Sequence, residues 1–134
     1  VLQFRSGALG RAGAFGMCVA EPYLEGEYVK HNDNNGGVES AAELPQAFSH
    51  YTYEASGRCL MVCDIQGVGD FYTDPQVHSA ESSGEAFGMG NMGLEGMARF
   101  LQSHRCGPTC AKLGLPAIRP AETDAQMAER LQRE

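Results

Sequence analysis

The sequence predicts a single domain, or part of one, of the α+β class, and three observations support this prediction. The chain has 134 residues, and 43% of them are apolar, which is enough for a modest core. Its 17 glycines and the lack of tryptophan indicate many turns instead of a helical bundle. One almost continuously apolar segment and two segments with helical periodicity predict a mixture of strands and helices.

The first third of the chain is expected to hold few regular elements. Four glycines within residues 6–16 disfavour a helix or strand there. Residues 17–23 predict a short strand that ends at Glu21-Pro22. The run HNDNNGG at residues 31–37 predicts a turn, because Asn, Asp and Gly tolerate unusual backbone angles.

The middle of the chain predicts a helix followed by a buried strand. Residues 40–54 are expected to form the helix, with Pro45 near its start. Residues 58–65 (RCLMVCDI) predict the strand, and their near-continuous apolar character predicts burial of both faces. Cys59 and Cys63 are therefore expected to be core residues and not ligands, and Cys18 has no distinguishing context.

The last third predicts one amphipathic helix over residues 91–103. Four apolar residues recur there at i, i+3, i+4 and i+7, namely Leu94, Met97, Ala98 and Leu101. The charged residues 122–134 predict either a short helix or an irregular tail.

Charge and cysteine usage exclude several classes of function. The formal net charge is −7 with no run of Lys or Arg, so we expect no nucleic-acid partner. No apolar stretch approaches the roughly 20 residues that span a bilayer, so we expect no membrane association. Five cysteines without a secretory pattern favour free thiols or a metal over disulfides, and a cytoplasmic location is expected.

A cluster of metal-binding residue types follows the amphipathic helix. His104, Cys106 and Cys110 lie within seven residues, and His104 continues the apolar stripe of the helix. Imidazole and thiolate suit structural zinc in a closed tetrahedral site. His50 is a candidate for the fourth ligand, although its spacing alone favours an ordinary core histidine. A helix cap with two buried thiols is the alternative interpretation of the cluster.

Acidic residues flank the turn that follows the predicted buried strand. Asp64 ends the strand, Gln66 lies two residues later, and Asp74 follows in the sequence YTDP. Two carboxylates and an amide oxygen would suit Mg²⁺, and an aspartate at a strand end can orient a hydroxyl group in phosphoryl transfer. Asp64 and Asp74 are equally compatible with ordinary turn residues, and the spacing alone does not decide.

Residues 88–93 (GMGNMG) match the pattern G-x-G-x-x-G. The pattern indicates dinucleotide binding only after a strand, and the residues before it are typical of a loop. We therefore reject an NAD site here, while contact with a phosphate or a peptide backbone remains open.

Four stretches together resemble the alpha-kinase family of atypical protein kinases. They are EPYLEGEYVKHNDNN at 21–35, PQAFSHYTY at 45–53, DIQGVGDFYTDPQVH at 64–78 and FGMGNMGLEGMARFLQSHRCGPTC at 87–110. The motifs appear in family order and spacing over about residues 21–115, which is more specific than any single pattern.

The resemblance implies roles in catalysis and nucleotide binding. Asp64 looks like the catalytic aspartate, with Gln66 as its magnesium-side partner and Asp74 as the second acidic residue of the site. Lys30 matches a lysine beside the active site. Glu21 looks like the hinge residue that meets the adenine of ATP, and Leu24 lines that pocket.

The resemblance also implies a zinc site and a substrate loop. His50, His104, Cys106 and Cys110 match the four structural zinc ligands, which changes the interpretation of His50. Gly88, Gly90 and Gly93 match a loop that engages the peptide substrate. The expected activity is transfer of the ATP γ-phosphate to Ser or Thr of a protein, for example a translation elongation factor.

The resemblance further predicts how the chain is divided. Residues 21–115 correspond to the C-terminal lobe of the kinase fold, residues 1–20 to a remnant of or junction to the N-terminal lobe, and residues 116–134 to a charged tail. In this family the N-terminal lobe carries a lysine that contacts the phosphate groups of ATP. No lysine precedes Lys30, so the chain alone is expected to be inactive. A catalytically inactive lobe that serves as a zinc-stabilised binding module is the alternative function. A metal-dependent hydrolase and a zinc-knuckle RNA-binding protein fit less well.

Overall fold

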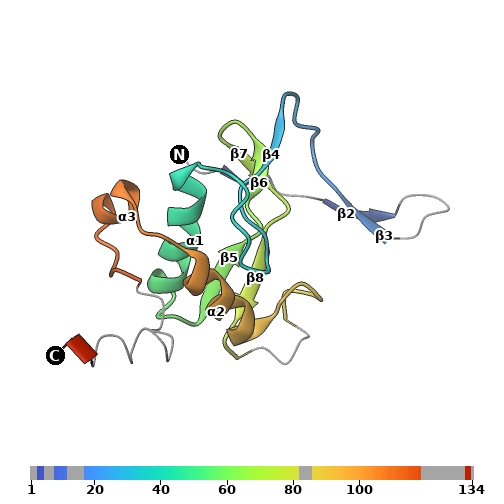
Figure 1. The fold of residues 1–134 in the computed structure, drawn as a ribbon. Coiled ribbons are helices and arrows are strands. Elements are labelled where there is room, and N and C mark those ends of the chain that lie inside the picture. Colours follow the sequence, from blue (N-terminus) through green and yellow to red (C-terminus); the bar gives the residue numbers. More distant parts are fainter. Residues whose placement is uncertain (1–2, 5–7, 12–16, 82–85, 119–131, 134) are drawn as a thin grey trace.

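The computed structural model describes residues 3–4, 8–11, 17–81, 86–118 and 132–133, so most of the predicted charged tail lies outside the described residues. The chain combines helices with short strands, as the sequence predicted (Figure 1). The elements are β1 (Gln3–Phe4), β2 (Ala8–Arg11), β3 (Met17–Ala20), β4 (Tyr28–Lys30), α1 (Glu43–Ala55), β5 (Leu60–Cys63), β6 (Gln66–Val68), β7 (Phe71–Thr73), β8 (Gln76–Ser79), α2 (Gly93–Ser103) and α3 (Pro108–Lys112).

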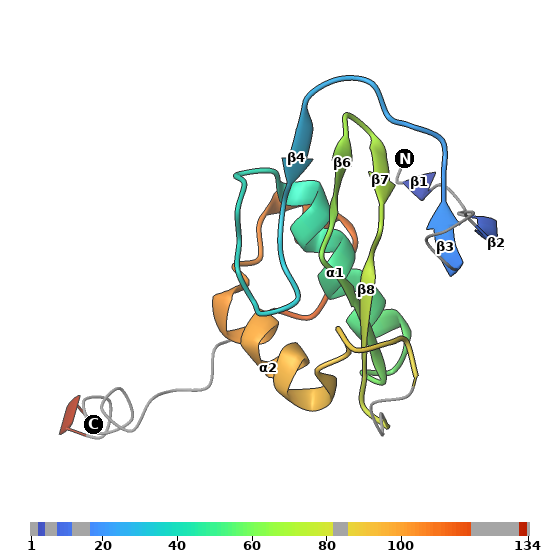
Figure 2. The ribbon, with the colours of Figure 1, turned by 90° about the vertical axis from the view of Figure 1, so that its right-hand side faces the viewer.

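The strands form three small sheets. A four-stranded sheet has the order β1-β7-β6-β4, and β2 pairs with β3 and β5 with β8 in two-stranded sheets. The antiparallel hairpin β6–β7 continues into the antiparallel pair β5–β8, and Figure 2 shows β8 as the extension of β7. This hairpin therefore connects two of the sheets.

The long hairpin bends where it passes from one sheet to the other. Cys63 pairs with Gln76 on one side of the bend, and Gln66 pairs with Thr73 on the other. Residues 64–65 and 74–75 are thus left opposite each other. Asp64 (φ 59°) and Asp74 (φ 49°) both adopt the left-handed backbone conformation, which Asp tolerates better than most residues. The bend brings both predicted acidic site residues to one place.

The core lies between this hairpin and the helices. α1 packs on β5, and α2 packs on β8. The central cluster consists of Met61, Met97 and Phe100, and the half-buried residues Tyr53, Ala80 and Leu101 surround it. Burial of these three side chains stabilises the fold by roughly 1.5–3 kcal/mol each.

The structure corrects the predicted inward face of α2. The helix begins at Gly93, two residues later than predicted, and Leu94 and Ala98 are exposed. Its buried face is instead formed by Gly96, Met97 and Phe100. A glycine at position 96 lets the helix approach β8 closely, so the residue facing inward is one that an apolar pattern does not detect.

The structure also corrects the predicted central strand. β5 is shorter than residues 58–65, and it buries only the face that carries Met61 and Cys63. Leu60 is 36% exposed, and Cys59 is exposed and not a core residue. The apolar run is therefore a one-sided strand, since α1 covers a single face of the β5–β8 pair.

One further expectation was wrong. Residues 8–11, within the glycine-rich stretch, form β2, because pairing with β3 satisfies their backbone groups. Pro108 opens α3, where its missing N–H costs nothing. α1 was predicted at 40–54 and spans Glu43–Ala55, with Pro45 in its first turn.

In the described part of the chain, no helix has the length and apolar character needed to cross a membrane.

Gly67 in β6 offers a test of the hairpin. A Cβ atom there would overlap the backbone oxygen of Phe71 on β7, which cannot rotate away. We expect Gly67→Ala to lower the free energy of unfolding by about 3 kcal/mol or more, and Gly69→Ala, in open space at φ 57°, by about 1 kcal/mol. Urea denaturation measures both, and equal losses would contradict the proposed packing of the hairpin.

Candidate functional site

Three residues lie side by side across the four-stranded sheet, next to the bend of the hairpin. Lys30 of β4 pairs with Gln66 of β6, and Gln66 pairs with Thr73 of β7. Directly opposite residues in a sheet present their side chains on the same face. This face therefore carries a cation, an amide and a hydroxyl group beside the two aspartates of the bend.

Asp64 is the centre of the polar contacts on this face. Its Oδ1 lies 2.8 Å from Nζ of Lys30, and its Oδ2 accepts a hydrogen bond of 3.0 Å from Nε2 of Gln66. The Asp64 side chain is only 19% exposed. The hydrogen bond to Asp64 raises the pKa of Lys30, so the lysine is held in its charged form.

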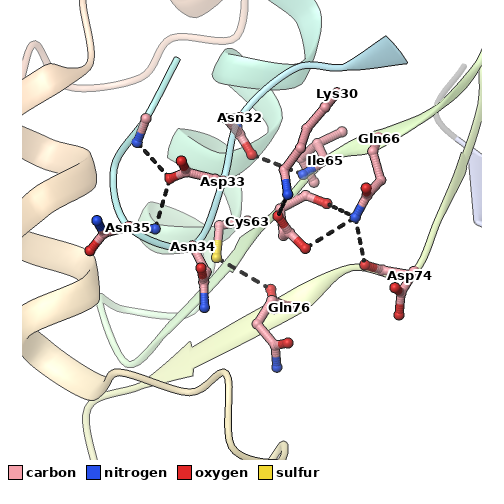
Figure 3. A network of polar contacts seen from close by, with 12 residues as sticks. Lys30, Asn32, Asp33, Asn34, Asn35, Cys63, Ile65, Gln66, Asp74 and Gln76 are labelled. Atoms are coloured by element: carbon pink, nitrogen blue, oxygen red, sulfur yellow. Dashed lines mark hydrogen bonds and ion pairs between the residues drawn. The ribbon is translucent and has the colours of Figure 1, made fainter. Parts of the chain in front are cut away.

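Gln66 connects Asp64 to Asp74 across the bend. Its Nε2 also donates to the backbone oxygens of Asp64 (3.2 Å) and Asp74 (3.3 Å), as Figure 3 shows for Asp74. The sequence predicted that the amide oxygen of Gln66 would face the carboxylates, whereas its N–H group does. Gln66 therefore bonds the carboxylate of Asp64 and the backbone oxygen of Asp74, whose side chain is exposed.

The backbone that follows Asp64 is hydrogen-bonded to the side chain of Asn32, which is fully buried. The Oδ1 of Asn32 accepts a hydrogen bond of 2.9 Å from the N–H of Ile65 (Figure 3). Its Nδ2 donates to Oε1 of Gln46 (3.0 Å) and to Oγ of Ser49 (3.2 Å), both on α1. One amide side chain thus fixes the backbone between Asp64 and Gln66 to a helix.

The predicted adenine-contacting residues lie in the connection between β3 and β4. The carboxylate of Glu21 accepts a hydrogen bond from the hydroxyl group of Thr73, the neighbour of Asp74. Leu24 is half-buried in the same connection. Glu21 is thereby tied to the same edge of the site as Asp74.

Tyr28 belongs to the site, and the sequence analysis did not identify it. Burial raises the pKa of its hydroxyl group, and the nearby carboxylates of Asp74, Asp64 and Glu21 raise it further. Tyr28 therefore lies within electrostatic reach of all three acidic residues. Its position two residues before Lys30 could have identified Tyr28 from the sequence, because residues i and i+2 of a strand share a face.

The glycine loop, residues 86–93, lies beside β8. Gly88 and Gly93 have positive φ angles of 82° and 60°, and a Cβ at Gly90 would overlap the side chain of Gln76. Oδ1 of Asn91 accepts hydrogen bonds from the N–H groups of Gly93 (2.9 Å) and Ser79 (3.0 Å). The backbone conformation favours glycine at 88 and 93, and the contact with Gln76 favours it at 90, so the loop has a defined shape.

A second cluster joins α1 to the segment after α2. One ligand atom each from His50, His104, Cys106 and Cys110 lies within 4.8 Å of the others. Sγ of Cys106 is 3.7 Å from Nδ1 of His50, and Sγ of Cys110 is 3.5 Å from Nε2 of His104. The structure therefore brings His50 to the other three residues, as the family resemblance implied and its spacing did not.

The geometry and protonation of this cluster suit a metal ion. Sulfur and nitrogen ligands on a tetrahedral zinc ion lie about 3.6 Å apart, close to the two distances found here. Burial, with smaller effects of His50 and Arg105, lowers the pKa of His104 to about 4, so its ring is neutral and able to bind a cation. Burial raises the pKa of the Cys110 thiol and so disfavours the thiolate form. A bound cation would stabilise that thiolate.

A model of the alpha-kinase family matches residues 3–110 of the chain. This match begins at residue 3, whereas the resemblance in the sequence analysis began at residue 21. The chain is 53% identical over 103 residues to myosin heavy chain kinase C of Dictyostelium discoideum, covering 76% of this chain and 13% of that protein. It is 50% identical over 109 residues to human eukaryotic elongation factor 2 kinase, covering 78% of this chain and 15% of that protein.

Solved structures show the same similarity. The alpha-kinase domain of myosin heavy chain kinase A in complex with ADP superposes with a TM-score of 0.81 at 41% identity. The superposition covers 87% of this chain and 49% of that chain. The same domain in complex with AMP-PNP gives a TM-score of 0.80. The chain therefore spans about half of the domain that it matches.

Proposed function

Because this chain belongs to the alpha-kinase family, we propose that it is the C-terminal lobe of a protein kinase that phosphorylates Ser or Thr of a protein substrate. In this proposal residues 21–115 form the lobe, residues 1–20 join it to the N-terminal lobe, and residues 116–134 are a tail. The chain spans 49% of the ADP-bound domain of its relative, so the activity is proposed for a protein that contains the whole domain.

The observation that carries the proposal is the contact of Asp64 with Lys30 and Gln66 at the bend of the hairpin. Phosphoryl transfer needs positioning and neutralisation of charge more than covalent chemistry by the protein. In our proposal Asp64 accepts the hydrogen bond of the substrate hydroxyl group and orients it. Lys30 and Gln66 hold the Asp64 carboxylate in place, and Asp74 contributes the second negative charge.

The proposed cofactors are ATP and Mg²⁺. Glu21 and Leu24 would contact the adenine ring, which is consistent with the ADP and AMP-PNP complexes of the relative. The carboxylates of Asp64 and Asp74 supply oxygen atoms, the ligand type that Mg²⁺ prefers, so these two residues fit that ion. The amide of Gln66 would have to turn its oxygen toward the ion, because its N–H group bonds Asp64. When bound, Mg²⁺ would neutralise the charge of the phosphate groups.

The proposed partner is a protein, engaged through the loop that contains Gly88, Gly90 and Gly93. One set of relatives is named for elongation factor 2 and another for the myosin heavy chain. A translation elongation factor is the candidate that we propose first. An inactive lobe that only binds a partner is the alternative, and the following assay separates the two.

Replacement of Asp64 tests the proposed activity. Transfer of labelled phosphate from ATP with Mg²⁺ to serine- and threonine-containing peptides is measured for the chain and for the chain with any preceding sequence that its gene encodes. We expect activity in the longer protein and a loss of about 100- to 10,000-fold in Asp64→Asn, because the group that orients the hydroxyl is removed.

The matched control is Asp70→Asn, since Asp70 is an exposed residue of the turn in the same hairpin. This variant is expected to keep the activity. Undiminished transfer by Asp64→Asn would contradict the catalytic role of Asp64, and a folded longer protein without any transfer would favour the binding module.

The proposal includes a structural zinc ion at His50, His104, Cys106 and Cys110. Four protein ligands close the coordination sphere, which is typical of structural and not catalytic zinc. The ion would join α1 to α3 and to the segment that connects α2 and α3. Thr109 already donates a hydrogen bond of 2.9 Å to Glu43 at this junction.

Removal of one ligand tests the metal site. We expect the purified chain to hold one zinc per molecule by elemental analysis, and Cys110→Ser to lose the metal and melt at a lower temperature, because metal binding and folding are coupled. Cys59→Ser is the control, since Cys59 is exposed and lies outside the cluster. Full zinc content and an unchanged melting temperature in Cys110→Ser would disprove the assignment.

A further inference from the structure

His78 is a buried histidine that neither the proposed catalysis nor the proposed zinc site uses. It lies on β8, is 1% exposed, and pairs across the sheet with Met61 of the core. A Cβ at Gly96 would overlap its ring, so α2 packs directly against the imidazole. The ring is therefore held in one position by packing from a strand and a helix.

Both ring nitrogens of His78 bind backbone groups from different loops. Nδ1 accepts a hydrogen bond of 3.0 Å from the N–H of Met92 in the glycine loop. Nε2 lies 2.9 Å from the backbone oxygen of Asn34. Because a backbone N–H can only donate and a carbonyl can only accept, the ring is the neutral tautomer with its proton on Nε2. Burial lowers the pKa of His78, which favours this neutral form.

Two neighbouring side chains hold the same loop. Gln76 lies two residues before His78 on β8 and donates a hydrogen bond of 3.0 Å to the backbone oxygen of Phe87. The side chain of Asn34 donates one of 3.0 Å to the backbone oxygen of Gly90. Figure 3 shows the contact between Cys63, the residue before Asp64, and the backbone oxygen of Gln76. The glycine loop is thus bonded at Phe87, Gly90 and Met92 to elements that adjoin the active site.

We propose that His78 is a positioning residue that fixes the glycine loop to the 31–37 loop, and thereby sets how tightly the substrate is engaged. This inference rests on the proposed kinase function, because the loop is taken to bind the protein substrate. The 31–37 loop follows Lys30 directly and contains Asn32, so His78 links the substrate loop to the part of the chain that holds Asp64.

Two substitutions separate the two hydrogen bonds of His78. The Oδ1 of Asn occupies the place of Nδ1, so His78→Asn retains an acceptor for Met92. The terminal amide of Gln occupies the place of Nε2, so His78→Gln retains a donor to Asn34 and loses the acceptor. Hydrogen exchange of the Met92 amide in the 134-residue chain reads this difference without any need for activity.

We expect the Met92 amide to exchange roughly 3- to 10-fold faster in His78→Gln than in the original chain, because one hydrogen bond is lost. In His78→Asn the rate is expected to stay near the original value. Melting curves of both variants confirm that they are folded. Equal exchange in both variants would overturn the assigned role of Nδ1.

Kinetics in the catalytically complete protein test the second half of the inference. We expect His78→Gln to raise the KM for a peptide substrate by the same 3- to 10-fold and to leave the KM for ATP near its original value. We expect His78→Asn to keep the original peptide KM. A faster Met92 exchange without a change in peptide KM would overturn the link to the substrate. Absence of phosphate transfer in the unmodified protein would count against the proposed function, while the exchange result stands separately.

Discussion

The side-chain amide of Asn32 makes three hydrogen bonds at a place that water does not reach, and the candidate active site depends on them. Its oxygen binds the N–H of Ile65, and its nitrogen binds Gln46 and Ser49 of α1. A buried polar group left without a partner costs about 1–3 kcal/mol. Because of this cost, three parts of the chain keep a single arrangement: the segment after β4 that carries Asn32, helix α1, and the backbone between Asp64 and Gln66.

The other features of the site build on this arrangement. The bend of the hairpin sets Asp64 opposite Asp74, and the pairing of β4 with β6 brings Lys30 to Asp64. One turn along α1 from Gln46, the cluster that contains His50 joins the same helix to the segment after α2. A zinc ion there would stiffen α1 and, through Asn32, the segment that carries Asp64. We therefore regard the proposed metal site as a support for the proposed catalytic site.

The sequence predicted the residue types of both sites better than their geometry. The pattern of α1 and the position of Asp64 after an apolar strand were sufficient to find these elements. Burial of Cys59 and Leu94 was predicted wrongly, because a local apolar pattern does not show which face a neighbouring helix covers. Asn32 and His78 were missed as well, since their roles come from backbone groups more than ten residues away.

The exchange rate of the Ile65 amide in Asn32→Ala tests the central claim most directly. The exposed Asn35 of the same loop provides the control variant, Asn35→Ala. We predict that Ile65 exchanges roughly 3- to 10-fold faster or more in Asn32→Ala and at its original rate in Asn35→Ala, because only the first change removes its hydrogen-bond acceptor. An Ile65 amide that stays equally protected in both variants would contradict the account.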